Sequence, residues 1–100
     1  MKKLLPIGSV VLLQNGVKKV MVTGYMAMDQ NNSGKIYDYS GCIYPEGLLS
    51  SDQTLLFYHD QIEQVCFEGY QGEEYALFQK QLEEVQKRFH TEETTVDTLE

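Results

Sequence analysis

The chain has 100 residues, of which 42% are hydrophobic and 11% aromatic, so it can form one domain with a small core and is too apolar to be disordered throughout. Its formal net charge is −7, but residues 1–45 carry a net of +3 and residues 46–100 a net of −10. Nucleic-acid binding needs clustered Lys and Arg to displace counterions from phosphates, so this charge disfavours a nucleic-acid partner and an anionic membrane surface.

The beginning of the chain, MKKLLPIGSVVLL, imitates the charged and apolar regions of a secretory signal peptide. Pro6, Gly8 and Ser9 interrupt the apolar run, and two further lysines stand where a cleavage site of small residues should follow. No stretch approaches the roughly 20 apolar residues that span a bilayer. We therefore expect a cytoplasmic protein that does not insert into a membrane.

The dipeptide Asn15-Gly16 is the clearest local signal in the sequence. It predicts a type I′ turn, in which both residues have positive φ, between antiparallel strands at residues 9–14 and 17–25. In this register Val11 faces Val20. The first strand is apolar on both sides, which suits a small closed barrel or a covered sheet better than a sheet with one face in water.

Three further stretches are typical of strands: residues 36–44, 55–58 and 62–67. Gly41 within the first of them predicts a bulge or a sharp bend. The polar residues 59–61, between the last two, are expected to form a single helical turn.

From Glu73 onward the hydrophobic period becomes that of a helix. Apolar side chains recur at intervals of three and four residues and share one face: Tyr75, Phe78, Leu82, Val85 and Phe89. Such a face usually packs on the core of its own domain; the alternative is a docking surface for a partner helix, including a second copy of this chain. Residues 91–100 lack the period and are expected to be a disordered acidic tail.

Strands followed by a helix predict an α+β fold. We expect a small bent antiparallel sheet or an SH3-like barrel of about five strands, followed by one C-terminal amphipathic helix. Residues 1–90 are expected to form a single domain.

The stretch DQNNSGKI, residues 29–36, is similar to the start of a calcium-binding loop. Its first half supplies oxygen ligands and a glycine at the required positions, but Ser40 stands where the bidentate glutamate is needed. The flanking segments are also strand-like rather than helical. The stretch is therefore predicted to connect the second and third strands, and we expect no metal and no cofactor.

Nothing in the sequence signals a catalytic centre. Cys42 and Cys66 form no zinc spacing with His59 and His90 and are expected to be reduced thiols, with a bridge or a reactive thiol as the alternative. His59 and Asp60 are neighbours, and neighbours on an extended segment point apart, whereas catalysis needs convergent groups. We expect a protein without enzymatic activity; a small enzyme that uses His59 is the weakest alternative.

Two predicted strand ends combine an aromatic residue, an acid and a turn residue: Tyr44-Pro45-Glu46-Gly47 and Phe67-Glu68-Gly69-Tyr70. Turn formation and core packing explain both, but loops at strand ends also carry function on many scaffolds. The candidate protein-interaction residues are therefore Tyr44, Glu46, Glu68 and Tyr70, together with the apolar face of the helix. The acidic second half of the chain would suit a basic partner.

The segments LPIGSVVLL, KKVMVTGY, YDYSGCIYPEG and FYHDQIEQVCFEGY, in this order and followed by an amphipathic helix, resemble domain-of-unknown-function family 4176 over residues 4–90. Members of that family occur in Gram-positive bacteria, often encoded near type VII secretion components and LXG-type toxins. The resemblance implies an accessory factor, such as a chaperone or a targeting adaptor, whose partner is a toxin or a secretion component. An immunity protein that neutralises the toxin is the alternative, and the resemblance assigns no functional residue.

Overall fold

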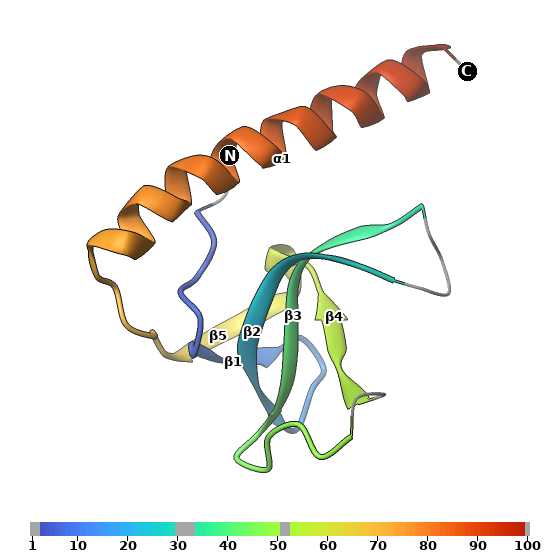
Figure 1. The fold of residues 1–100 in the computed structure, drawn as a ribbon. Helices are drawn as coiled ribbons and strands as arrows, with labels where there is room; N and C mark the ends of the chain where they lie inside the picture. Colours follow the sequence, from blue (N-terminus) through green and yellow to red (C-terminus); the bar gives the residue numbers. More distant parts are fainter. Residues whose placement is uncertain (1–2, 30–33, 51–52, 100) are drawn as a thin grey trace. The chain divides into compact units, whose positions relative to one another are not determined.

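The structure is a computed structural model that describes residues 3–29, 34–50 and 53–99, with side chains up to residue 88. Within these residues the chain forms five strands, one short 3-10 turn and one α-helix (Figure 1). In chain order they are β1 (Val10–Leu13), β2 (Lys19–Met28), β3 (Ile36–Tyr44), β4 (Leu55–Phe57), the turn η2 (His59–Gln61), β5 (Ile62–Phe67) and α1 (Glu73–Leu99). Two compact units result: Leu4–Tyr70 hold all five strands, and the other unit holds α1.

The five strands form one antiparallel sheet in the order β4-β3-β2-β1-β5. Because β4 and β5 are its edges, the sheet is open, which is the first of the two forms predicted from the sequence. Figure 1 shows β2 and β3 as a long hairpin that bends strongly. With the helix that follows, the α+β class is confirmed.

The bend in the hairpin coincides with a bulge on β2. The register shifts between Val22 and Gly24, so Thr23 is the extra residue opposite β3, and Val22 pairs with Gly41. A Cβ atom on Gly41 would lie 2.7 Å from the backbone oxygen of Met21, closer than such atoms approach in proteins. The glycine that predicted the bend is therefore needed for close packing, and the bulge lies on the strand opposite it.

The predicted pairing of β1 and β2 is confirmed, since Val11 pairs with Val20. The predicted type I′ turn is wrong. Asn15 has a φ of 65°, but Gly16 does not have a positive φ, and its N–H donates to the carbonyl of Leu13 (2.9 Å). The pairing of β1 with β2 ends before the turn, because the N–H of Gln14 donates instead to the carbonyl of Gln61, just before β5, at 2.8 Å. A tertiary hydrogen bond thus reshapes the loop without changing the register.

The inner face of the sheet carries most of the core of the strand unit. Its buried side chains are those of Val11, Val20, Val22, Tyr39 and Phe57, each at most 3% exposed. The Tyr39 and Phe57 rings stack with their centroids 5.1 Å apart. Burial of each such side chain contributes roughly 1.5–3 kcal/mol, so this face holds the bent sheet together.

Other boundaries follow the sequence closely. The strands predicted at residues 36–44 and 62–67 and the helical turn at residues 59–61 are confirmed, and β4 is one residue shorter than expected. The stretch after β2 connects it to β3 as predicted, although residues 30–33 lie outside the described residues. The expectation about calcium in that stretch stays a prediction.

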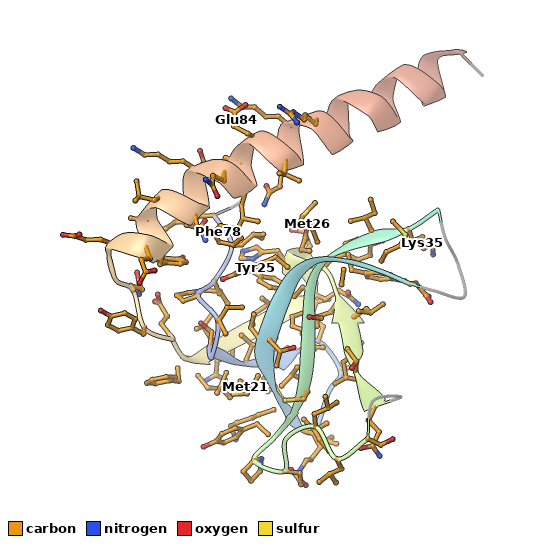
Figure 2. The ribbon with its side chains drawn as sticks, in the orientation of Figure 1. Met21, Tyr25, Met26, Lys35, Phe78 and Glu84 are labelled. Atoms are coloured by element: carbon orange, nitrogen blue, oxygen red, sulfur yellow. The ribbon has the colours of Figure 1, made fainter. Side chains whose placement is uncertain are left out.

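Helix α1 begins at Glu73, as predicted, and Glu73 and Glu74 in its first turn suit the positive end of the helix dipole. Its backbone is helical through Leu99, so it takes in most of the segment assigned to a tail, and the domain limit at residue 90 stays a prediction. Figure 2 shows Phe78 and Glu84 on different sides of α1, in keeping with an amphipathic helix. Among the described residues, no helix has the length and apolar character needed to cross a membrane.

Candidate functional site

A group of hydrogen bonds surrounds Tyr39, in the middle of β3. Its buried hydroxyl lies 2.6 Å from Nδ1 of His59 and accepts a hydrogen bond from the N–H of Leu5 at 3.0 Å. The hydroxyl of Tyr39 therefore links His59 to the segment before β1.

Two further hydrogen bonds complete this group. The N–H of His59 donates to Oδ2 of Asp38 (2.7 Å), and the hydroxyl of Tyr25 donates to the carbonyl of Leu5 (2.5 Å). The group thus fastens η2 and the segment before β1 to the central hairpin. Because Nδ1 of His59 takes part in these contacts, the histidine has a structural role: it helps to hold η2 on the hairpin.

An ion pair joins the two loops at the other end of the hairpin. Nζ of Lys18, just before β2, lies 2.6 Å from Oε2 of Glu46, just after β3. The hydrogen bond from Lys18 and one from the backbone N–H of Glu46, with the nearby positive charge, hold the pKa of Glu46 below its ordinary value, while partial desolvation opposes them. Both side chains are exposed, so the pair contributes little to stability and chiefly orients the loops.

The outer face of the sheet is an unusually apolar surface. Residues paired across antiparallel strands point to the same side, so the register defines this face as two rows. Across β5, β1, β2 and β3, one row is Phe67, Val10, Met21 and Cys42, and the other is Gln64, Leu12, Lys19 and Tyr44. We call these eight residues the outer face.

Part of the apolar area of the outer face is accessible. Phe67 is 62% exposed and Tyr44 45%, Met21 and Leu12 are half-buried, and Val10 and Cys42 are buried beneath them. Strands lie about 4.8 Å apart, so the face is roughly 14 Å wide from β5 to β3. An antiparallel sheet with a wet face usually places polar residues there. Clustered exposed aromatic and aliphatic side chains are instead typical of binding surfaces.

The strand at one edge of this face, β5, is irregular. It pairs with β1 through two register shifts, which leave Cys66 and Glu63 as extra residues. All its residues except Ile62 are exposed. Bulges of this kind twist an edge strand and disturb its outward row of hydrogen-bonding groups. The edge is therefore poorly suited to pair with an added strand, and the face beside it is the better contact surface.

Comparison with protein families now adds to these observations. A family described as a domain of unknown function (DUF4176) matches residues 4–78, the whole strand unit and the first turns of α1. The chain belongs to the DUF4176 family. The family expected from the resemblance is thus confirmed, whereas no curated protein and no solved structure matches the chain.

In this DUF4176 protein, the candidate interaction residues fall in three places. Tyr44 lies on the outer face, with the Lys18–Glu46 pair beside it. Glu68 and Tyr70 follow β5, which ends beside Val10 at the start of β1, whereas Tyr44 lies in the row of Leu12 near the other end of β1. The structure therefore does not bring the two strand ends together. Tyr70 is 87% exposed. The remaining candidates are on α1: Tyr75, Phe78, Leu82, Val85 and Phe89, the last with its side chain outside the described part of the chain.

Sequence reasoning missed most of the DUF4176 outer face. Phe67 was noted only as part of a strand end, and Met21 and Lys19 were not candidates. A residue's face depends on register, and two bulges set the register of β5. One signal was available. A first strand that is apolar on both sides already implies that something covers, or is meant to cover, its outer side.

Proposed function

We propose that this DUF4176 protein is a non-enzymatic protein-binding module. The observation that carries the proposal is the apolar outer face, which lies on an open sheet and exposes Phe67 and Tyr44. Aromatic side chains on a rigid strand lose little conformational entropy on binding and are frequent anchors of interfaces. A sheet also holds these anchors in fixed relative positions, which favours recognition of one shape.

The contacts of His59 support the non-enzymatic part of the proposal. A general base needs an unprotonated nitrogen within reach of the proton it removes. Nδ1 of His59 is instead held by the Tyr39 hydroxyl, and the backbone N–H of His59, which is not part of the ring, donates to Asp38. Both interactions are explained by the packing of η2 on the hairpin.

We propose further that the protein acts in the cytoplasm as an accessory factor, a chaperone or a targeting adaptor, for an LXG-type toxin exported by type VII secretion. This choice of partner rests on the association that the family resemblance implies. A chaperone of this kind would cover apolar surface of its partner before export, and an exposed apolar face is the feature such a task requires.

Co-expression with a toxin encoded next to the gene would test the proposal. The full chain should raise the soluble and exported amounts of the toxin, and the variant Phe67→Ser should not. Val65→Ser is the matched control, because Val65 is also a partly exposed apolar residue of β5 but pairs with Val11 on the inner face. Equal toxin solubility with and without the chain, for every neighbouring toxin, would refute the proposal.

The same experiment separates a chaperone from an immunity protein. An immunity protein should restore growth when it meets a toxin that is already folded, because it blocks the active site. A chaperone should act only when it is present during synthesis. Rescue by late induction of the chain would therefore favour the immunity alternative.

A further inference from the structure

One charged residue lies within the apolar outer face. Lys19 stands between Leu12 on β1 and Tyr44 on β3, and its side chain is exposed. Its neighbour Lys18 is paired with Glu46, but Lys19 forms no ion pair within the part of the chain that the structure describes. The face therefore combines apolar anchors with one uncompensated positive charge.

This charge restricts what can cover the face. A partner that buries Phe67 and Tyr44 also removes water from the ammonium group of Lys19, which stands beside Tyr44, and a buried charge without a counter-ion is strongly unfavourable. A carboxylate on the partner compensates that loss through a charge-assisted hydrogen bond. A second lysine or arginine at the same place would add repulsion.

The manner of contact is restricted as well. The two bulges at Cys66 and Glu63 interrupt the edge of β5, and β4 at the other edge has only three residues. Neither edge offers a long regular row of backbone groups. Contact through side chains on the outer face is therefore favoured over addition of a strand.

We propose that the outer face binds a segment of another protein whose apolar side chains cover Phe67, Met21 and Tyr44 and whose Asp or Glu carboxylate pairs with Lys19. The inference rests on the proposed function and names the chemistry of the partner. It is compatible with a partner that is basic overall, because the net charge of the chain acts over long distances whereas Lys19 acts at contact.

Short random peptides displayed on phage and selected on the full-length chain provide the probe. Enriched peptides should combine aromatic or aliphatic residues with Asp or Glu. Synthetic copies of them should bind Lys19→Gln about fivefold more weakly than the unchanged chain, which is the upper end for an ion pair at a partly exposed site. The loss should shrink as salt is added.

Lys35→Gln is the matched control, because Lys35 is an exposed lysine of the same sheet unit at the far end of the β2–β3 hairpin from Met21 (Figure 2). It should bind the peptides as the unchanged chain does. Replacing the peptide's carboxylate by an amide should weaken binding to the unchanged chain but not to Lys19→Gln, as expected for two groups that contact each other. Folding of each variant is checked by circular dichroism.

Several results would overturn the inference: no enriched peptide, enriched peptides without acids, or equal binding by Lys19→Gln and the unchanged chain. Self-association of the chain that Lys19→Gln abolishes would place a second copy on the face and would overturn it too. If the chain solubilises a toxin and Lys19→Gln does so equally well, the proposed function stands and the inference about Lys19 fails.

Discussion

Several parts of the strand unit depend on the hydroxyl group of Tyr39, and Tyr39→Phe removes that group without changing the ring. The ring keeps its stack on Phe57, at 5.1 Å, whereas the N–H of Leu5 and Nδ1 of His59 lose their partner. A buried polar group left without a partner costs about 1–3 kcal/mol. Both groups are only partly buried, so we expect a total loss of about 2 kcal/mol in the free energy of unfolding.

For a domain of this size, a loss of about 2 kcal/mol lowers Tm by about 8–16 °C. Urea denaturation followed by circular dichroism, together with calorimetry, measures both quantities. Tyr37→Phe is the matched control. It makes the same chemical change on the same strand, where the Tyr37 ring packs 4.6 Å from that of Tyr58, but its hydroxyl has no hydrogen bond among the described residues. We expect that control to stay within about 0.5 kcal/mol of the unchanged chain.

The coupling to His59 is tested in the same way. If the hydroxyl acts partly through Nδ1, then His59→Ala should cost less stability in the Tyr39→Phe background than in the unchanged chain. Equal losses for Tyr39→Phe and Tyr37→Phe, or fully additive losses for Tyr39→Phe and His59→Ala, would refute the structural account of His59.

Three more predictions concern charge, packing and accessibility. The pKa of Glu46, measured by NMR, should lie below that of an ordinary glutamate and rise in Lys18→Gln. The ion pair should stabilise the fold at pH values above the pKa that Glu46 has in the unfolded chain, and this stabilisation should be lost as the pH falls through the lowered pKa of the folded state. Gly41→Ala should lower the free energy of unfolding by about 1–3 kcal/mol, because the added Cβ would lie 2.7 Å from a backbone oxygen. Cys66, which is exposed, should react with a thiol reagent in the folded protein, and Cys42, 3% exposed, only after unfolding.

Each of these has a control. Gly34→Ala should change stability by no more than about 0.5 kcal/mol, since nothing lies within 4 Å of the added Cβ; a cost equal to that of Gly41→Ala would contradict the packing argument. A Glu46 pKa that does not respond to Lys18→Gln would contradict the ion pair. Equal reaction rates of the two thiols in the folded chain would contradict the burial of Cys42.

The sequence predicted those parts of the fold that depend on neighbours along the chain. The turn-forming Asn15-Gly16 centres the β1–β2 pairing correctly, and the change of hydrophobic period at Glu73 marks the start of α1. It failed where distant residues decide. The loop after β1 opens because the N–H of Gln14 donates to the carbonyl of Gln61, and no residue near Gln14 in the sequence predicts that contact.

The candidate site shows the same division. Tyr44 was found because it ends a strand beside a turn, which is a local pattern. Met21 shares a face with it through the β2–β3 register, in which Met21 pairs with Cys42. Phe67 joins that face through its pair with Val10, which depends on the bulges in β5. The chemistry of His59 was open for a similar reason, since its partner Tyr39 lies 20 residues earlier.

The outer face also ties recognition to folding. Its eight residues come from four strands and extend from Val10 to Phe67, so no short piece of the chain carries it. A partner that binds it can bind only the folded state, and binding then shifts the unfolding equilibrium by mass action. At a free partner concentration about 100 times Kd the shift is roughly 2.7 kcal/mol. The thermal stability of this small protein should thus rise with the concentration of its partner, and a shift in Tm becomes a direct assay for the partner itself.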